Sequence, residues 1–565
     1  MPNVLELDTR FSQQPQANIP RSVIPRKSDL KTTMKFGKLY PIYCDEILPA
    51  DSKKMGIGSL VRMATPLFPV MDSSYLDFYA FFVPNRLVWS HWEEFMGENK
   101  DSAWVSDIQY SIPSLDLLTS KGDYDEEDGF KPDGIFDHFG LPTDVRIPIG
   151  THISALPLRS YILIWNEWFR DQNYQNPVQL NTGDDDSNNT YTLLSVNKLH
   201  DEFTSVLPEP QKGESVSLVF NGGSAPVYAL PNNNFNTFDD YIEAWQDFTG
   251  EDWDGMKANL QSVSTNSNGP IVVRGKDVVI DTSGSTPGNV GHEFIPGNLA
   301  ADVRSVTLNT INQLRNAVVV QQYLERLALG GSRYTEIIRS MFGVLSPDAR
   351  LQRPELLGHI RLNIEMQQVV QTSFIGGGEW SDNITPLGNT GAYSKTTGYE
   401  FLFDKSFVEH GHLIIVACAR TEQSYQQGLD RMWSRKAVTD FYNPLFANIG
   451  NQPILNERIY FSANAAQNKE VFGYQEAWSE YRYKPNRVSG AFRSMHPYSL
   501  DAWHYSQYFT TLPRAGSDFL KQDSEVVERT LAVQDDPAQL LCNFFFDEVA
   551  TRPMPVYSIP GLDVL

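Results

Sequence analysis

The sequence predicts an all-β core that carries long connections, some of them helical. Three observations support this fold class. Apolar, strand-like runs dominate the chain of 565 residues, at 73–84, 399–404, 411–421 and 456–462. No strand–helix–strand unit recurs, which argues against a doubly wound α/β fold. The 38 glycines and 34 prolines are spread along the whole chain, as expected for many turns rather than one linker.

The first element is an extended, basic N-terminal arm at residues 1–40. Prolines recur there every five residues from Pro15 to Pro25 and exclude a helix. Residues 10–38 hold seven basic side chains against one acid, although the whole chain has a net charge of −23. The composition fits a solvated tail or a tail that neutralises nucleic-acid phosphate. The candidate DNA-facing residues are Arg10, Arg21, Arg26, Lys27, Lys31 and Lys35.

Residues 41–172 form the first part of the predicted core. The run 73–84 is apolar on both faces, as in a buried strand of a sandwich, and residues 89–97 are a helical candidate. The next segment, 173–298, is rich in Asn, Gly, Ser and Asp and holds seventeen acids against five bases. We interpret it as an acidic surface insertion with strands at 215–220 and 271–280; a separate acidic domain is the alternative. The candidate external side chains are Asp184, Asp185, Asp186, Asp239 and Asp240.

Residues 299–550 form the second part of the core, with helical loops. Apolar side chains recur at mostly helical spacing over 308–329, where two glycines follow and end the helix. Ser332 is suited to cap a second helix at 333–342. The proline-punctuated residues 551–565 are predicted to form an extended C-terminal arm.

The residue pattern excludes several kinds of chemistry. Three cysteines lie far apart without a CxxC pair, which excludes a zinc ribbon and a disulfide scaffold and fits a reducing compartment. We expect no signal peptide, and the longest apolar run, 413–419, is far too short to span a bilayer. Phosphate-loop, nucleophile-elbow and zinc-protease motifs are absent. His410 and His412 would share a strand face, as a pair of metal ligands could. Packed or hydrogen-bonded histidines are favoured, because no third potential ligand lies at a spacing typical of metal sites. We therefore expect no catalytic residue, no metal and no cofactor.

Residues 474–505 interleave aromatic and basic side chains. Such a surface can stack unpaired bases and hold their phosphates. It can equally form a subunit interface, where Tyr, Trp and Arg are enriched, and this second interpretation is favoured. The candidates are Trp478, Tyr481, Arg482, Tyr483, Arg487 and Arg493.

Several long runs resemble the major capsid protein of the gokushoviruses, a branch of the microviruses, which are small single-stranded DNA phages. They cover most of the chain outside 173–298, in the right order. The runs are FFVPNRLVW (81–89), NEWFRDQN (166–173), INQLRNA (311–317), GGSRYTEII (330–338), FGVLSPDARLQRPELLG (342–358), SFVEHGH (406–412), YQQGLDRMWSR (425–435) and FGYQEAWSEYRY (472–483).

The resemblance implies a fold and a role. The fold would be an eight-stranded antiparallel jelly-roll β-sandwich with long, partly helical interstrand insertions. The role would be that of a structural protein, not an enzyme, sixty copies of which form a T=1 icosahedral shell around a circular single-stranded DNA genome. The insertion 173–298 would project around the three-fold axes and take part in host attachment. A carbohydrate-binding β-sandwich and a jelly-roll hydrolase are the alternatives, disfavoured by the missing signal peptide and the missing catalytic motifs.

The resemblance also implies partners and a place. The chain would form pentamers and a full shell, and would meet packaged single-stranded DNA without sequence specificity. A small basic DNA-packaging protein, an internal scaffolding protein, a DNA pilot protein and an unknown host surface receptor would be further partners, with no membrane insertion. The protein would belong to the virion and assemble in the cytoplasm of the bacterial host. In such a shell, Arg21, Arg26 and Lys27 could instead pair with acids of a neighbouring subunit.

Overall fold

The structure is a computed structural model. It describes residues 20–96, 110–115, 123–125, 129–148, 150–186, 188–213, 227–229, 271–274, 277–280, 299–301, 311–329, 352–373, 387–533 and 538–557. The chain divides into two compact units. One comprises Met1–Lys212 with Glu325–Leu565, and the other comprises Gly213–Leu324.

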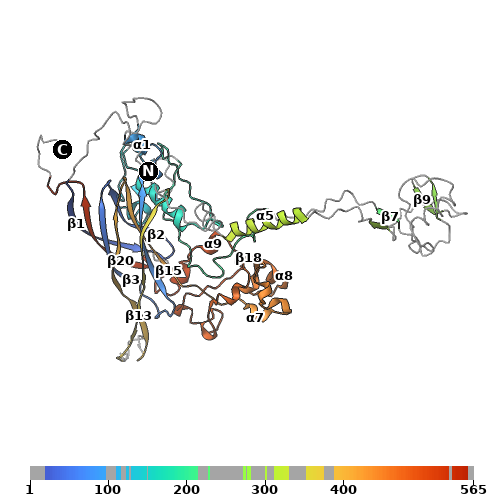
Figure 1. The fold of residues 1–565 in the computed structure, drawn as a ribbon. Coiled ribbons are helices and arrows are strands. Elements are labelled where there is room, and N and C mark those ends of the chain that lie inside the picture. The colour runs from blue at the N-terminus through green and yellow to red at the C-terminus, as the bar shows by residue number, and fades with distance from the viewer. Residues whose placement is uncertain are drawn as a thin grey trace, which may run out of the picture. The chain divides into compact units, whose positions relative to one another are not determined.

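The first unit is built on two four-stranded sheets with only antiparallel neighbours (Figure 1). The strand order of the first sheet is β1-β20-β3-β14, and that of the second sheet is β11-β4-β15-β2. The predicted β class is therefore confirmed. The strands of the first sheet are β1 (Ser22–Met34), β20 (Leu540–Arg552), β3 (Ser52–Met63) and β14 (Thr396–Ser406). Those of the second sheet are β11 (Glu355–Asn363), β4 (Ser74–Pro84), β15 (Gly411–Thr421) and β2 (Leu39–Ile47).

An apolar core fills the space between the two sheets. Along β20 every second side chain is buried, so Phe544 points into the core while the neighbouring Phe545 lies on the outer face of the first sheet. The ring of Phe544 meets that of Phe78 from β4 edge to face, with centroids 5.3 Å apart. Contacts of this kind hold the sheets together as a sandwich.

The second sheet is covered on its other face as well. There, Ile414 and Val416 of β15 and Phe81 of β4 join a second apolar cluster with Tyr161 and Ile162 of helix α3 (Leu156–Ile164). This double burial explains why β4 and β15 are apolar on both faces, as the sequence predicts for 73–84 and 411–421. The first sheet differs, because large side chains stay exposed on its outer face: Tyr399, Phe401, Leu541 and Phe545.

Smaller elements decorate the first unit. The paired strands are β5 (Tyr124–Asp125) with β6 (Gly129–Phe130), β12 (Met366–Val370) with β13 (Thr390–Ser394), β16 (Ser424–Tyr425) with β19 (Asn486–Arg487), and β17 (Asn451–Leu455) with β18 (Val471–Glu476). The short helices are α1 (Trp92–Phe95), α2 (Ile135–His138), α7 (Arg431–Ser434), α8 (Ala465–Lys469), α9 (Ser517–Leu520) and α10 (Glu525–Glu528). The predicted helix at 89–97 is thus a single turn. The predicted strand at 456–462 is wrong, since a 3-10 turn at Asn456–Arg458 follows β17 directly.

In the second unit, β7 (Val227–Ala229) pairs with β10 (Leu299–Ala301), and β8 (Ile271–Arg274) pairs with β9 (Asp277–Ile280). The strands predicted at 271–280 are confirmed as the β8–β9 hairpin. Helix α5 (Ile311–Leu329) confirms most of the helix predicted at 308–329. The strand predicted at 215–220 and the helix predicted at 333–342 lie outside the described residues.

Both predicted arms contain sheet strands. Residues 22–34 form β1, which pairs along its whole length with β20. Proline is tolerated at position 25 because β1 is an edge strand, where a missing N–H donor need not break the ladder. At the other end, β20 runs to Arg552 before the proline-rich segment begins. Proline spacing alone therefore does not separate an arm from an edge strand.

Candidate subunit and nucleic-acid surfaces

Arg26 is held within the fold by a cluster of charged side chains. Its guanidinium lies 2.7 Å from a carboxylate oxygen of Asp45 and 3.5 Å from one of Glu548. The fully buried Lys53 pairs with the same two acids, 2.9 Å from Glu548. The hydrogen bond with Asp45 raises the pKa of Arg26, since it stabilises the charged form. Arg26 therefore ties β1 both to β20 of its own sheet, through Glu548, and to β2 of the second sheet, through Asp45, and is not a free cation.

The other basic candidates fall into two groups. Lys35 is paired 2.7 Å from Glu528, and Arg21 donates to the Ser52 hydroxyl over 2.7 Å. Lys27 and Lys31 are exposed on the outer face of the first sheet. In the part of the chain that the structure describes they make only surface ion pairs, Lys27 with Asp547 at 3.4 Å and Lys31 with Asp29. Such pairs contribute little free energy, so both lysines stay available to another anion. Arg10 lies outside the described residues.

Two cations on this outer face escaped the sequence reasoning. Lys54 and Arg62 of β3 are exposed there, and Arg62 stands opposite the exposed Leu541 of β20. The alternation of β3 could have revealed them, because Lys54 and Arg62 are an even number of residues apart and share a face. Lys31, Leu60 and Arg62 line a shallow hollow of about 430 Å³.

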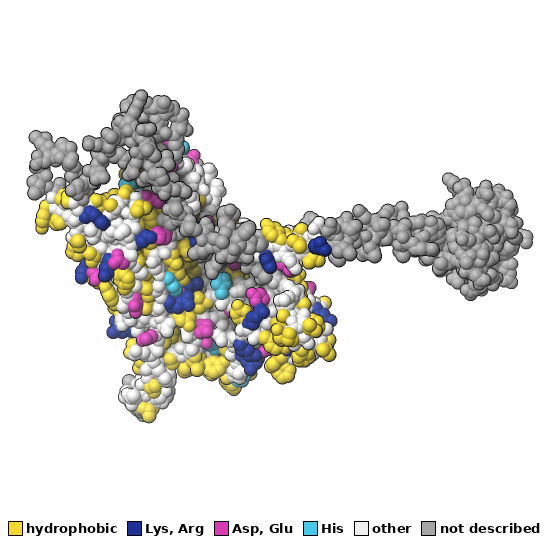
Figure 2. All heavy atoms as spheres, in the orientation of Figure 1, with side chains coloured by type: hydrophobic (Ala, Val, Ile, Leu, Met, Phe, Trp, Pro, Cys, Tyr) yellow, Lys and Arg dark blue, Asp and Glu magenta, His cyan; other side chains and the backbone are white. Residues whose placement is uncertain are grey.

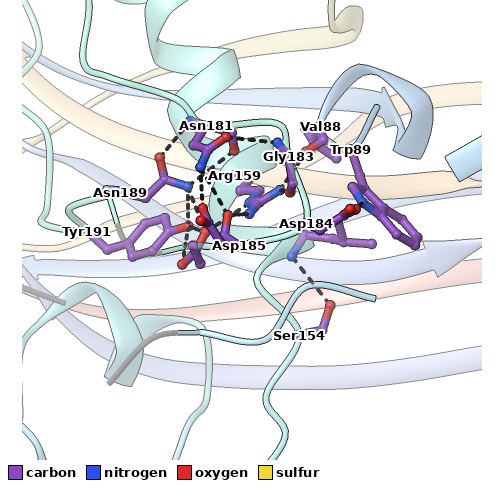
Figure 3. A network of polar contacts seen from close by, with 12 residues as sticks. Val88, Trp89, Ser154, Arg159, Asn181, Gly183, Asp184, Asp185, Asn189 and Tyr191 are labelled. Atoms are coloured by element: carbon purple, nitrogen blue, oxygen red, sulfur yellow. Dashed lines mark hydrogen bonds and ion pairs between the residues drawn. The ribbon is translucent and has the colours of Figure 1, made fainter. Parts of the chain in front are cut away.

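Three of the five aspartates predicted as external, Asp184, Asp185 and Asp186, belong to the first unit. Figure 3 shows the polar contacts around this run. Asp186 is only 4% exposed, and its carboxylate lies 2.9 Å from the guanidinium of the fully buried Arg159 in α3. The Asp184 carboxylate accepts hydrogen bonds from the indole of Trp89 and the ring of His91, both at 2.8 Å. For Asp186 the structure therefore corrects the expectation of an external side chain.

Arg159 also ties down the loop that carries these aspartates. It donates to the backbone carbonyls of Gly183 (2.8 Å) and Asp185 (2.7 Å), so that its donors are shared between carbonyls and the Asp186 carboxylate (Figure 3). The side chain of Asp185 is exposed, whereas the Tyr191 hydroxyl donates to Asp186 at 2.8 Å. The second unit accordingly begins at Gly213 rather than at residue 173. Asp239 and Asp240 lie outside the described residues.

The candidates in 474–505 do not form one continuous surface. Trp478 is buried, and its indole donates to the carbonyl of Phe446 over 2.9 Å. Tyr481 is exposed, and the guanidinium of Arg435 lies 4.6 Å from the centre of its ring. The remaining candidates are exposed: Arg482 paired with Glu476, Tyr483, Arg487 in β19, and Arg493, which donates to the Gln426 carbonyl over 2.9 Å. Trp478 thus supports the loop at 442–446, since Tyr442 also packs edge-on against its ring.

A larger apolar surface lies next to them. Residues 432–449, here called the 432–449 patch, expose a set of large apolar side chains, and Figure 2 shows hydrophobic side chains gathered around the position of α7 and α8. The exposed fraction reaches 70% for Trp433 and 87% for Leu445. Contiguous exposed apolar groups of this kind mark interaction surfaces. The set comprises Met432, Trp433, Val438, Phe441, Tyr442, Leu445 and Ile449.

Comparison with known proteins identifies the family. The model of a family described as "Capsid protein (F protein)" matches residues 12–562. The chain is 40% identical to capsid protein VP1 of Bdellovibrio phage phiMH2K, over 98% of this chain and 97% of the relative. It is 38% identical to capsid protein VP1 of Chlamydia phage 1 (100% and 98%) and 37% identical to that of Spiroplasma virus 4 (98% and 97%).

The chain belongs to the phage capsid protein (F protein) family. The resemblance to gokushovirus major capsid proteins is confirmed, and with it the role of a structural protein of the virion. A capsid protein acts as one subunit of a larger shell. The exposed 432–449 patch, which a monomer would leave in water, is consistent with that role.

The capsid protein shows no cluster of metal-binding side chains within its described residues. His410 precedes β15 and lies edge to face with Trp92, at 5.6 Å between ring centres, while His412 is buried inside the strand. In the described part of the chain, no helix is long and apolar enough to cross a membrane.

We expect the capsid protein to lose stability on acidification in two separate pH ranges. Burial lowers the pKa of His412 to about 4, so the unfolded chain takes up this proton first and stability falls from about pH 6.5 towards 4. Burial alone would raise the pKa of Asp77, but the hydrogen bonds and charges of Arg361 and Arg420 outweigh it, and the net shift is downward. The stability that Asp77 contributes is present above about pH 4 and lost below it.

Thermal melting between pH 3 and 7 measures both effects. The variant H412Q should reduce the fall in stability only in the upper range, and D77N only in the lower one, because other histidines and aspartates with lowered pKa values contribute to the rest. A melting temperature of the native protein that stayed constant between pH 6.5 and 4, or that fell there equally in H412Q, would contradict the assignment to His412.

Proposed function

We propose that this chain is the major subunit of a T=1 icosahedral shell, in which sixty copies enclose a circular single-stranded DNA genome. The match to capsid proteins along nearly its whole length carries the proposal. The exposed 432–449 patch supports it, because obligate assemblies bury such apolar groups between subunits. Sedimentation and negative-stain microscopy of the purified protein test it. Pentamers or shells are expected, and a compact 63.9 kDa monomer that persists at high concentration would contradict the proposal.

We further propose that the two sheets form an eight-stranded jelly roll. The strand order supports this topology, since each step from one sheet strand to the next crosses to the other sheet, except the step from β4 to β11. Two four-stranded sheets joined by crossing connections are typical of the jelly roll. In chain order these strands are β1, β2, β3, β4, β11, β14, β15 and β20.

The outer face of the first sheet is our proposed DNA-facing surface. It exposes Lys27, Lys31, Lys54 and Arg62, which can neutralise phosphates, beside Tyr399 and Phe401, whose rings can stack on bases. Acids share the face at Asp29, Asp404 and Asp547, so the attraction is local and the contact carries no base-reading geometry.

Removal of positive charge from this face should reduce the amount of DNA that each shell contains. We expect the triple variant K27Q/K31Q/K54Q to form shells that hold less DNA than native shells, with a deficit that is largest at low salt and shrinks as the salt concentration rises, because fewer counterions are released on binding. Ultraviolet absorbance of purified shells at 260 and 280 nm measures the DNA content. The contrasting variant R26Q should instead lower thermal stability, since it leaves Asp45 without one of its cationic partners. Failed assembly of the triple variant would show that these residues bind a neighbouring subunit, and shells with a normal DNA content would contradict the DNA-facing role.

We also propose that the acidic second unit takes part in host attachment. Its composition supports this role, because segment 173–298 carries most of its acids beyond residue 200 and like-charged loops on neighbouring copies repel unless they face solvent. The variant D239N/D240N should assemble with unchanged yield while the rate of adsorption to host cells changes at least about twofold, an amount that corresponds to a few tenths of a kcal/mol. Assembly that fails in D239N/D240N would contradict an external position of this loop.

The remaining partners are proposed from family membership. They are a small basic DNA-packaging protein, an internal scaffolding protein, a DNA pilot protein and an unidentified host surface receptor, with assembly in the bacterial cytoplasm. Co-expression of the capsid protein with each phage protein, followed by scoring of shells, tests which of them assembly requires.

A further inference from the structure

A cavity of about 820 Å³ lies where the turn between β1 and β2 meets two later segments of the first unit. The N–H of Val196 donates to the carbonyl of Gly37 over 2.9 Å, and the N–H of Lys198 donates to the carbonyl of Leu520 over 2.8 Å. Gly37 adopts φ +82°, and a Cβ there would lie 2.4 Å from the carbonyl oxygen of Gln522. Only glycine allows this close approach, so the backbone fixes the shape of the cavity.

Positive charge gathers around this cavity. Two of its lysines are neutralised, Lys35 by Glu528 at 2.7 Å and Lys521 by Asp518 at 2.9 Å. The lining contains five basic residues, Lys35, Lys38, Lys198, Arg514 and Lys521, and three acidic residues, Asp518, Asp523 and Glu525. The partners of the other three basic residues, Lys38, Lys198 and Arg514, decide whether the cavity keeps an uncompensated positive charge.

Lys198 is the most unusual of the three. It is 4% exposed, and its ammonium lies 4.5 Å above the ring of Phe519. Within the described residues no carboxylate oxygen comes within 4 Å of it. The nearby carboxylates are engaged elsewhere, since Asp201 accepts from the Tyr425 hydroxyl at 2.5 Å and Asp523 accepts from the N–H of Glu525 at 2.8 Å. Burial lowers the pKa of Lys198 to about 8, although the charges of Asp523 and Asp201 oppose this shift.

Lys38 and Arg514 are likewise short of anionic partners. Among the described residues, the Lys38 ammonium has only neutral acceptors, the Leu193 carbonyl at 3.3 Å and the Ser195 hydroxyl at 3.4 Å. Burial lowers the pKa of Lys38, and the charge of Lys521 adds to the shift. Arg514 is exposed and has no ion pair with any described residue. Burying a cation without an anion is costly, so an anion in the cavity would offset that cost.

We propose that this cavity binds a phosphate group, with Lys198 and Lys38 as its principal contacts and Arg514 at the exposed side. Phosphate oxygens accept strong, charge-assisted hydrogen bonds from ammonium and guanidinium groups. The cavity volume is in the range of small-ligand sites, and Tyr508 and Phe509 in its lining offer rings on which a base can stack. A phosphodiester of packaged single-stranded DNA is the source that we infer. That source depends on the proposed function, whereas the phosphate site does not.

The test uses the full-length chain and two probes. A fluorescently labelled single-stranded oligonucleotide is followed by anisotropy, and inorganic phosphate is followed by thermal stabilisation relative to chloride at constant ionic strength. In K198M and in K38Q we expect binding of both probes to weaken at least about tenfold, the loss of one hydrogen bond to a charged group. The matched control K395Q removes an exposed lysine from the segment between β13 and β14 and should bind as the native protein does. K38Q answers the question if K198M fails to fold.

A pH series adds a signature that general electrostatics would not give. Phosphodiesters do not titrate between pH 7 and 9, so oligonucleotide binding should weaken across pH 8 in the native protein as Lys198 loses its proton. The change should be smaller in K198M, where Lys38 is the remaining buried lysine with a lowered pKa. Binding of phosphate without oligonucleotide would support the site but overturn DNA as its source. Binding of neither probe, or equal binding by K198M, K38Q and K395Q, would overturn the site. Shell assembly scored in parallel keeps this result separate from the proposed function.

Discussion

Replacement of Arg159 by methionine is expected to lower the free energy of unfolding of the capsid protein by about 3–5 kcal/mol. The reason is the burial of its partner, since R159M would leave the carboxylate of Asp186 inside the protein with no cation. Methionine keeps much of the volume of the arginine stem, so the change removes charge and hydrogen bonds rather than packing. The carbonyls of Gly183 and Asp185 lose their donors as well, which should loosen the whole loop around residues 181–191.

The measurement is urea or thermal unfolding of R159M beside a matched control. D185N suits this purpose, because the Asp185 side chain is exposed while only its backbone carbonyl accepts from Arg159. A change within about 0.5 kcal/mol is expected for this surface substitution. Equal stability of R159M and the native protein would mean that the carboxylate of Asp186 finds water or another donor, and the network would then have no structural importance.

The contact between Arg159 and Asp186 also explains why the sequence places the start of the acidic insertion too early, at residue 173 and not at Gly213. The run Asp184–Asp186 looks like solvated loop chemistry, because three adjacent acids with asparagines and a glycine around them are typical of a surface turn. For Asp186 that interpretation is wrong because of one cation, Arg159. This residue precedes Asp186 by 27 positions, and helix α3 holds it beside the carboxylate. Composition detects charge but not the long-range partner that lets a charge be buried.

Strand prediction succeeded for strands whose burial is visible in the sequence as an apolar run. β4 and β15 are apolar on both faces because they lie between two apolar clusters, and the sequence predicts both. β1 was missed because it is an edge strand with one solvated face, where Lys27, Asp29 and Lys31 are exposed and Pro25 is tolerated. The same distinction between local pattern and long-range contact applies to the candidate DNA-facing residues. The exposed lysines of β1 could be predicted from composition, whereas the commitment of Arg26 to Asp45 depends on a partner from another strand.

The second large effect is expected at the 432–449 patch. We expect W433D and L445D to abolish shell formation while the isolated subunit stays folded, since both side chains are mostly exposed in the single chain. Burial of these two side chains between subunits would contribute about 1.5–3 kcal/mol each, and a carboxylate in their place would be desolvated without a partner. A loss of about 3 kcal/mol per contact weakens pairwise association roughly a hundredfold. Sedimentation velocity and negative-stain microscopy measure the change.

A pair of valines provides the control for position. Val438 in the patch and Val408 between β14 and β15 are equally exposed, at 88% and 87%. V438D and V408D therefore introduce the same charge at the same exposure, and they differ in their surroundings. Val438 has other exposed apolar side chains along its segment, whereas Val408 stands between the buried Phe407 and the ion-paired Glu409. If the patch is a subunit contact, V438D should block assembly and V408D should not. Shells formed normally by W433D, L445D and V438D would show that subunits meet elsewhere, and the exposed aromatic side chains of the first sheet would then be the next surface to test.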